Sequence, residues 1–195
     1  MPIYDITNND IATKITQLYD VDSNNLATKI KEVYDISYAG TGSLVYVSTQ
    51  PLWLYNRGTM GAIGNFTNIG GVAGSTTTSS SRLHVGANAD TYGNRAGGAT
   101  VAVDLTPYKT LRVVATSSGA GTGSNSAKIG FATKRTQDDN LFVPSKGWTI
   151  NPGSSEKTFT WDISGHTGMY YFHVRVYNWS STAVWLRVHE AELLP

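Results

Sequence analysis

The sequence contains no cysteine and few charged residues, and each absence excludes a class of protein. Without cysteine the chain has no disulfide framework, no thiol nucleophile and no thiolate zinc site. Charged residues are 15% of the 195 residues, and 15 Lys and Arg balance 14 Asp and Glu to a formal net charge of +1. A nearly neutral chain gives no electrostatic reason to expect binding to nucleic acid or to an anionic membrane.

Long apolar runs are absent as well. No stretch approaches the roughly 20 apolar residues of a membrane-spanning helix, so we expect no membrane insertion. The opening residues MPIYDITNND have no basic segment followed by an apolar run, so we expect no signal peptide. Glycine, serine and threonine are abundant instead, which is typical of an all-β protein with many turns and a hydroxyl-rich surface.

The N-terminal part contains an internal repeat. A Tyr-Asp-aliphatic motif begins at Tyr4, Tyr19 and Tyr34, and the tetrapeptide Ala-Thr-Lys-Ile begins at Ala12 and again at Ala27. The apolar positions between these motifs have helical spacing, and Asn, Ser and Asp residues precede each run as capping residues. We therefore expect two short amphipathic helices.

Each predicted helix has about ten residues, too few to persist alone in water, so its apolar stripe must be buried. The residues predicted to serve oligomerisation or anchoring are Ile11, Ile15, Leu18, Tyr19, Leu26, Ile30, Val33 and Tyr34. The alternative is a helical hairpin that packs on its own β-domain.

The rest of the chain predicts a β-domain. We place the anchor at residues 1–42 and the β-domain at residues 43–195, with a glycine-rich joint between them. Strands are expected at 44–47, 52–55, 82–86, 100–105, 110–116 and 127–133, and a long surface loop with short strands inside it at 57–81. Short strands with turn signals and no intervening helix indicate an antiparallel β-sandwich or jelly roll.

The segment from Lys157 to Leu194 predicts three consecutive strands, because apolar residues alternate with polar ones along it. The loop at 178–182 is predicted to close a hairpin, with Arg175 opposite Trp185 and His173 opposite Arg187. After Glu190 the apolar phase slips by one residue, as a β-bulge would cause.

This predicted hairpin has one aliphatic face and one face of aromatic, arginine and histidine side chains. The second face consists of Tyr171, His173, Arg175, Tyr177, Trp185, Arg187 and His189. Planar rings beside hydrogen-bonding groups suit sugars, so these residues are the candidates for a glycan-binding or subunit interface. The alternative is structural: the glycine- and serine-rich segment or a neighbouring subunit covers the face, with Arg–Trp stacking as a packing device.

Three further rings, Tyr92, Trp148 and Trp179, occupy predicted turns. A bulky ring in a turn either plugs the end of the core or contacts a ligand.

No catalytic constellation stands out. The sequence lacks His-Glu-x-x-His and Gly-x-Ser-x-Gly motifs, and the glycines at 119–123 predict a plain flexible loop. Asp138-Asp139-Asn140 is the one acidic cluster of the β-domain; it could hold Ca²⁺, but we expect an exposed turn. We therefore expect no enzyme activity, no cofactor and no metal site.

Several segments resemble bacteriophage proteins. The repeats ATKITQLYD and ATKIKEVYD, which lead into GSLVY, resemble N-terminal modules of tailed-phage virion proteins. The run YNRG…NIGG, VDLTPYKTLRVVA and FTWDISGHTGMYYFHVRV…AVWLRVHEAEL resembles jelly-roll domains at the C-termini of phage tail, baseplate and head-fibre proteins.

This resemblance implies a virion structural protein of head-fibre, decoration or baseplate type, assembled in the host cytoplasm. It implies a homotrimer that is attached to other virion proteins through its N-terminal region, with its jelly roll outward and host-surface carbohydrate as a further partner. It assigns no catalytic or ligand residue. The alternative is a carbohydrate-binding module or adhesin whose main role is glycan recognition.

Overall fold

The computed structural model of the chain describes the backbone at residues 49–121, 124–136 and 142–195 and in six short strands of the first 48 residues. Side chains are described at 49–121, 124–136 and 147–195. The chain divides into two compact units, Met1–Gln50 and Pro51–Pro195. The sequence-based boundary after residue 42 falls earlier because β6 (Gly42–Val47) pairs with β5 (Glu32–Ile36) of the first unit.

The first unit consists of antiparallel strand pairs where its backbone is described. β1 (Ile3–Ile6) pairs with β2 (Ala12–Ile15), and β3 (Tyr19–Val21) pairs with β4 (Ala27–Lys29).

The two predicted helices are therefore not confirmed, because each described segment of the repeat is a strand. The physical reason is composition: the repeated Tyr-Asp-aliphatic and Ala-Thr-Lys-Ile motifs are rich in β-branched and aromatic residues, and the Tyr-Asp-aliphatic motif also alternates at a period of two. Short apolar runs of this kind fit either period. Among the predicted anchor residues, Ile11, Leu18, Leu26 and Ile30 lie outside the described residues.

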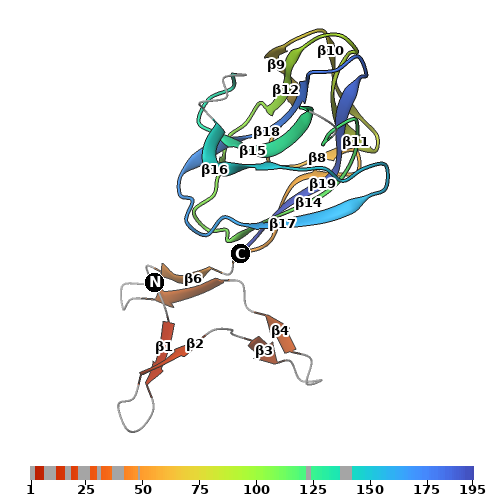
Figure 1. The fold of residues 1–195 in the computed structure, drawn as a ribbon. Coiled ribbons are helices and arrows are strands. Elements are labelled where there is room, and N and C mark those ends of the chain that lie inside the picture. The colour runs from red at the N-terminus through yellow and green to blue at the C-terminus, as the bar shows by residue number, and fades with distance from the viewer. Residues whose placement is uncertain are drawn as a thin grey trace. The chain divides into compact units, whose positions relative to one another are not determined.

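The second unit is an antiparallel β-sandwich of two sheets (Figure 1). The seven-stranded sheet has the order β10 (Gly74–Ser79), β11 (Arg82–Ala87), β19 (Val184–Leu194), β14 (Thr110–Ser118) and β17 (Lys157–Asp162), with β7 (Leu52–Asn56) beside β19 and β8 (Thr59–Met60) beside β7. The six-stranded sheet has the order β16 (Phe142–Thr149), β15 (Ser126–Ala132), β18 (Met169–Asn178), β12 (Gly93–Ala99) and β9 (Phe66–Gly71), with β13 (Val103–Asp104) beside β18. The predicted all-β antiparallel sandwich is confirmed.

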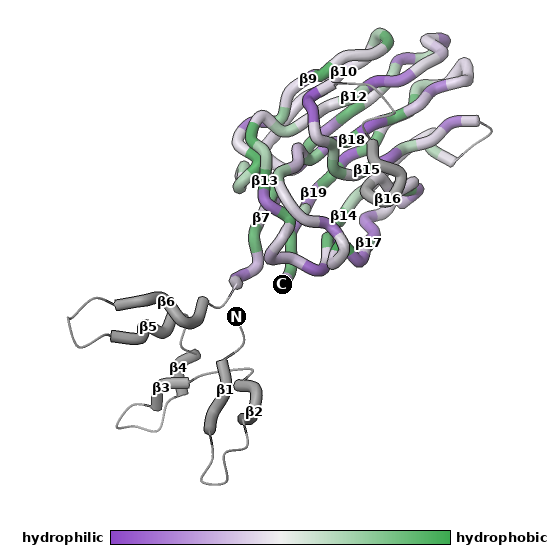
Figure 2. The backbone as a smooth tube through the Cα atoms, turned by 90° about the vertical axis from the view of Figure 1, so that its left-hand side faces the viewer, coloured by the Kyte–Doolittle hydropathy of each residue, from purple (hydrophilic) through white to green (hydrophobic). Residues whose placement is uncertain are grey.

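The core lies between the sheets and is built from the alternating apolar positions of the strands (Figure 2). Phe172, Val174 and Val176 of β18 are fully buried, as are Leu186 and Val188 of β19. Burial of each such side chain contributes roughly 1.5–3 kcal/mol, so the alternation predicted from sequence is also the main source of stability.

The bulge predicted near Glu190 is confirmed. Val114 of β14 is paired with Glu190, whereas the next residue, Ala115, is paired with Val188. His189 is thus the extra residue on β19, and the core positions shift from Val188 to Ala191.

The predicted hairpin between β18 and β19 is wrong. β18 pairs with β12 and β15, whereas β19 pairs with β11, β14 and β7, so the loop at 178–182 crosses from one sheet to the other. Arg175 lies opposite Lys128 and Ala96 instead of Trp185. The alternation that suggested a hairpin is shared by any two strands that face one core, so the pattern cannot distinguish a hairpin from a crossing between sheets.

Candidate functional site

The seven predicted interface residues lie on two different sheets. Four of them alternate with the core residues of β18 and so lie on the outer side of the six-stranded sheet: Tyr171, His173, Arg175 and Tyr177. The other three belong to β19 of the seven-stranded sheet, with Trp185 and Arg187 on its outer side and His189 in the bulge. The structure therefore does not bring them together into one surface, and each group is described by itself.

The β19 group is occupied by contacts within the protein. The guanidinium carbon of Arg187 lies 4.0 Å from the centre of the Trp185 ring and covers one face of it. His189 is buried, with Nε2 3.0 Å from Thr116 Oγ1 and Nδ1 3.2 Å from the Ser81 carbonyl oxygen. The Arg–Trp stacking here joins two residues of the same strand and does not cross between strands.

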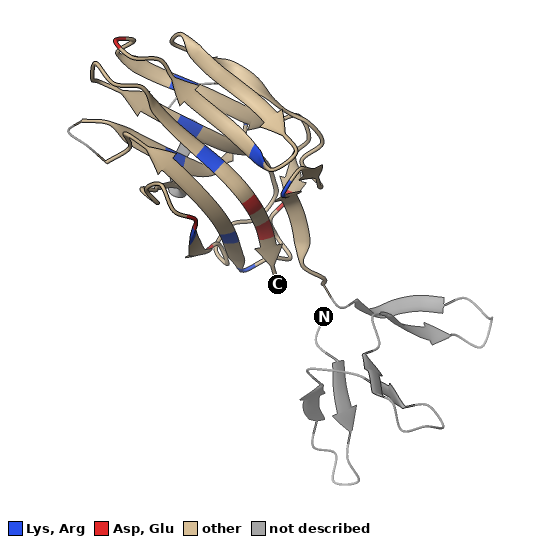
Figure 3. Cartoon of the chain, turned by 90° about the vertical axis from the view of Figure 1, so that its right-hand side faces the viewer, with Lys and Arg blue, Asp and Glu red and all other residues tan. Residues whose placement is uncertain are grey.

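The C-terminal half of β19 adds an ion-pair network on the same sheet, where basic and acidic residues lie on neighbouring strands (Figure 3). Arg112 lies 3.2 Å from Glu190 and 2.9 Å from Glu192, and Arg57 lies 2.7 Å from Glu190 and 2.8 Å from Glu156. All three carboxylates are thus held by arginine.

The outward-facing His173 of β18 lies between glycines of the two neighbouring strands. His173 lies opposite Gly130 of β15 and Gly98 of β12, and it is fully buried. Burial, together with the positive charges of Arg175 and Arg135, lowers the pKa of His173 to about 3, so the ring is neutral at physiological pH.

Arg175, the next outward residue of β18, is also buried, with 2% of its surface exposed. Its Nη2 donates a hydrogen bond of 3.2 Å to the carbonyl oxygen of Thr136, in the segment that follows β15. In the same segment Arg135 donates to the Ala99 carbonyl oxygen at 2.8 Å and to Thr67 Oγ1 at 2.7 Å. Hydrogen bonds therefore tie this segment to β18, to the end of β12 and to β9.

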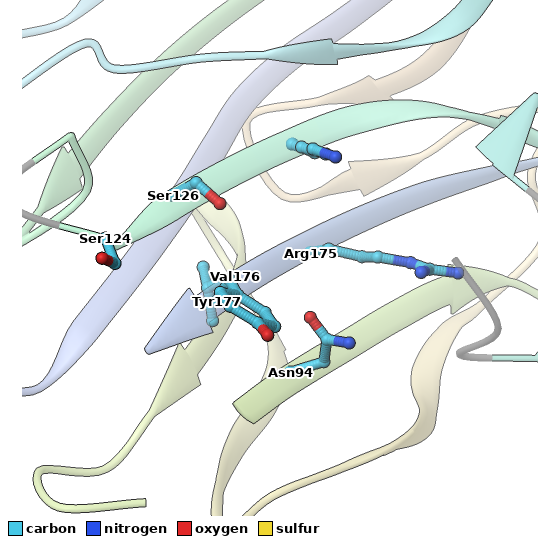
Figure 4. A pocket seen from close by; sticks show the side chains of 7 residues that line it. Asn94, Ser124, Ser126, Arg175, Val176 and Tyr177 are labelled. Carbon is cyan, nitrogen blue, oxygen red and sulfur yellow. The ribbon is translucent and has the colours of Figure 1, made fainter. Parts of the chain in front are cut away.

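A pocket of about 280 Å³ opens beside Arg175 on this sheet (Figure 4). We call it the β18 pocket; it is lined by Asn94, Ser124, Ser126, Lys128, Arg175, Val176 and Tyr177. Register explains this grouping, because Tyr177 lies opposite both Asn94 and Ser126 in adjacent strands, and Lys128 lies opposite Arg175. The lining thus combines one aromatic ring, amide and hydroxyl groups, and two cations.

Three aromatic side chains gather at the end of β18 that carries Tyr177. The Trp179 ring lies 5.5 Å from the Tyr177 ring and 6.2 Å from the Tyr92 ring, with interplanar angles of 58° and 53°. Tyr92 is 54% exposed and Trp179 is 50% exposed. We call these three residues the aromatic cluster; two of its rings present large apolar area to solvent beside the β18 pocket.

The loops that hold this cluster are fixed by buried asparagines. Asn178, which is fully buried, donates 2.7 Å and 3.1 Å hydrogen bonds to the carbonyl oxygens of Asn88 and Thr182. Asn125, 4% exposed, accepts a 2.7 Å hydrogen bond from the Trp179 backbone N–H and donates to Ser180 Oγ at 2.9 Å. Three loops are therefore tied together directly behind the exposed rings.

The backbone at Tyr92 is itself unusual. Its φ is 35°, in the left-handed region that a bulky residue rarely adopts, and Asp90 two residues earlier has φ 56°. The hydrogen bond from Asp90 N–H to the Ser180 carbonyl oxygen, 3.3 Å, and that from Thr91 Oγ1 to the Asn88 carbonyl oxygen, 2.7 Å, hold this turn. Such strain is found at sites where the position of a side chain matters for function.

Sequence alone left open whether the three rings in turns are plugs or ligand contacts, and the structure separates them. The turn predicted at Trp148 is wrong, because this residue lies in strand β16. Its ring is half-buried and stacks on Trp161 with ring centres 5.0 Å apart, so it closes the edge of the core. Tyr92 and Trp179 are exposed and belong to the aromatic cluster. The acidic triplet at 138–140 lies outside the described residues.

Neither a metal cluster nor a membrane-spanning helix occurs in the described part of the chain. Among these residues no group of three or more His, Cys, Asp or Glu side chains is placed to hold a metal ion. In the same residues no helix has the length and apolar character needed to cross a membrane.

Comparisons with known proteins give only distant similarities. Neither a protein-family model nor a curated protein matches the sequence. Among solved structures, a family 11 carbohydrate-binding module from Clostridium thermocellum in complex with a β-1,3-1,4-mixed-linked tetrasaccharide aligns at a TM-score of 0.48 and 13% identity, covering 74% of this chain and 95% of that one. A variant of a family 29 carbohydrate-binding module aligns at 0.46 and 9% identity, covering 74% of this chain and 91% of that one.

The glycoside hydrolase domain of Endo-D from Streptococcus pneumoniae R6 aligns at 0.45 and 13% identity, over 66% of this chain and 21% of that one. At these TM-scores the alignments do not identify a ligand for this chain.

The prediction of a phage virion structural protein is contradicted by these comparisons. The similar structures named here are carbohydrate-binding modules and a glycoside hydrolase domain, and none of the three is a virion protein. The virion location and the virion partners were implied by the phage resemblance alone and have no support here.

Proposed function

We propose that the chain is a carbohydrate-binding protein whose ligand site is the β18 pocket together with the aromatic cluster. The observation that supports this proposal most is the exposure of Tyr92 and Trp179 on loops held rigidly from behind, next to a pocket with hydrogen-bonding side chains.

The chemistry of a sugar matches both halves of this site. The faces of a pyranose ring carry C–H groups that pack on aromatic rings, and its edges carry hydroxyls that need donors and acceptors. Asn94, Ser126 and Tyr177 supply such groups on one side of the sheet (Figure 4). Half of the Trp179 surface is left for a ligand to cover.

The geometry also indicates the form of the ligand. The rings of the cluster are inclined by more than 50° to one another, so they do not make the flat row that a long straight polysaccharide chain would need. A pocket of about 280 Å³ beside inclined rings fits one or two sugar units at a bend or at a chain end.

Preorganisation strengthens this assignment. Immobilising a loop on binding costs affinity, and here the asparagine hydrogen bonds have already fixed the loops in the free protein. A weak, exposed contact surface would not need a buried network behind it.

The test is a glycan array probed with the wild-type protein and with two matched variants. Trp179→Ala removes an exposed ring of the cluster, and Trp185→Ala removes a ring from the outer side of the other sheet. We expect the wild type to bind a defined set of glycans, Trp179→Ala to lose about tenfold or more in affinity, equal to about 1.4 kcal/mol, and Trp185→Ala to keep its binding. Thermal melts of all three confirm folding.

The opposite pattern, with binding lost in Trp185→Ala and kept in Trp179→Ala, would move the site to the seven-stranded sheet. Binding to no glycan at all would refute the proposed function.

A further inference from the structure

The chain is nearly neutral overall, but its acidic residues are unevenly divided between the two sheets. The continuous path of the six-stranded sheet, β16-β15-β18-β12-β9, contains Arg95, Lys128, Lys146 and Arg175 and no Asp or Glu. In the seven-stranded sheet β19 and β17 contain Glu190, Glu192 and Asp162. One sheet is therefore purely cationic along this path.

The β18 pocket is lined by residues of β15, β18 and β12, the three inner strands of that path. Its two charged lining residues, Lys128 and Arg175, face the same side because they are directly opposed in the antiparallel pair of β15 and β18. Among the residues that the structure describes, no carboxylate lines the pocket. Asp104, on the short strand β13, lies opposite Met169 at the far end of β18 and binds Thr106.

Arg175 is buried and Lys128 is exposed, and each position favours the binding of an anion. Arg175 is buried, where the low dielectric strengthens the electrostatic field of its charge. Lys128 is exposed at the rim and forms no ion pair within the described residues, so its ammonium group is available to a ligand.

From this arrangement we propose that the β18 pocket selects an anionic sugar, one that bears a carboxylate or sulfate group, and places that group beside Lys128 and Arg175. This inference rests on the proposed function, since the same aromatic cluster receives the sugar ring. The charges of both cations attract a carboxylate or sulfate group, and the exposed Lys128 can donate a charge-assisted hydrogen bond to it, whereas the hydroxyls of a neutral sugar gain less.

The test uses pairs of ligands that differ in charge alone, measured by calorimetry on the intact protein. The pairs are tetragalacturonate with its methyl ester, sialyllactose with its methyl ester at the sialic acid carboxylate, and a sulfated galactan tetrasaccharide with its desulfated form. We expect the charged member of at least one pair to bind about tenfold tighter than its neutral partner at low salt, with the advantage reduced at 0.5 M salt. Which pair responds distinguishes carboxylate from sulfate.

Variants then locate the effect. Lys128→Met should remove about tenfold of the affinity for the charged member and leave the neutral member unchanged. Lys157→Met, an exposed lysine on β17 of the other sheet, is the matched control and should change neither.

Three results would overturn the inference, and they are distinguishable. Equal binding of charged and neutral members, weakened by Trp179→Ala, refutes the anionic preference and leaves the glycan site standing. Tighter binding of the charged members that neither Lys128→Met nor Trp179→Ala affects places the anion elsewhere. If no member of any pair binds and the glycan array is also empty, the proposed function fails as well.

Discussion

The buried His173 should make the stability of the sandwich depend on pH in a defined window. The folded protein keeps this ring neutral down to a pKa of about 3, because burial and the charges of Arg175 and Arg135 oppose its protonation. In the unfolded chain the ring has its ordinary pKa of roughly 6.5. Between these two values the unfolded state binds a proton that the folded state does not, so stability falls as the pH falls.

The size of the effect follows from the width of that window. Each pH unit below about 6.5 costs about 1.4 kcal/mol for one proton, so at pH 4.5 the loss is about 2–3 kcal/mol relative to pH 7.5. This is a large share of the roughly 5–15 kcal/mol that stabilises a typical domain.

The assay compares the wild type with His173→Gln by urea denaturation at pH 7.5, 6.5, 5.5 and 4.5. Carboxylates elsewhere titrate equally in both proteins, so the difference between the two curves isolates His173. The variant should start less stable, because the ring fills the space over Gly98 and Gly130, but it should lose about 2–3 kcal/mol less on acidification. Parallel curves for the two proteins would refute the assignment of His173 as a buried neutral ring.

Three further predictions address the loops, the glycine-rich strand and the first unit. Asn178→Ala should lower the free energy of unfolding by about 1–3 kcal/mol and weaken glycan binding, because the buried carbonyl groups of Asn88 and Thr182 lose the amide that donates to them. Denaturation measures the first effect and calorimetry the second. Gly97→Ala should cost about 1–3 kcal/mol in a denaturation experiment, because the new Cβ would lie 2.4 Å from Phe66 Cε1, whereas Gly165→Ala, with no atom within 4 Å, should be nearly neutral. Removal of residues 1–50 should leave a folded, monomeric sandwich by light scattering, and an oligomer that survives would show that the interface lies in the sandwich.

The C-terminal half of the fold is predictable because its strands alternate strictly. β18 and β19 bury their aliphatic residues on one side, and β17 packs Phe159 and Trp161 against the same core. The slip of the apolar phase after Glu190 is enough to predict the bulge. Alternation gives the face of each residue but not its partner strand, which is why the predicted hairpin between β18 and β19 is wrong.

The glycine-rich strand β12 is not predicted by the sequence, for a packing reason. Gly97 lies against Phe66, and Gly98 lies against His173 and Ile69, so neighbouring side chains fill the space that a strand-forming residue would need. The sequence therefore shows glycines where the structure has a central strand, and no apolar pattern remains to reveal it. β9 and β10 fall within the segment predicted as a long surface loop, for which short strands were expected without bounds.

The candidate site is predictable only in part. Arg175 and Tyr177 are among the predicted candidates and do line the β18 pocket, and Tyr92 and Trp179 are recognisable from sequence as rings in turns. Asn94, Ser126 and Lys128 are missed, because they join the pocket through strand pairings that are distant in sequence. The charge asymmetry between the sheets is hidden for the same reason: it exists only once the strands are sorted into sheets.

The most direct test of the central claim is a crystal structure of the protein with a glycan selected on the array. We expect sugar density against the rings of Trp179 and Tyr177, with hydroxyls within hydrogen-bond distance of Asn94 or Ser126. Sugar bound over Trp185 on the other sheet, or bound without contact to the aromatic cluster, would contradict it.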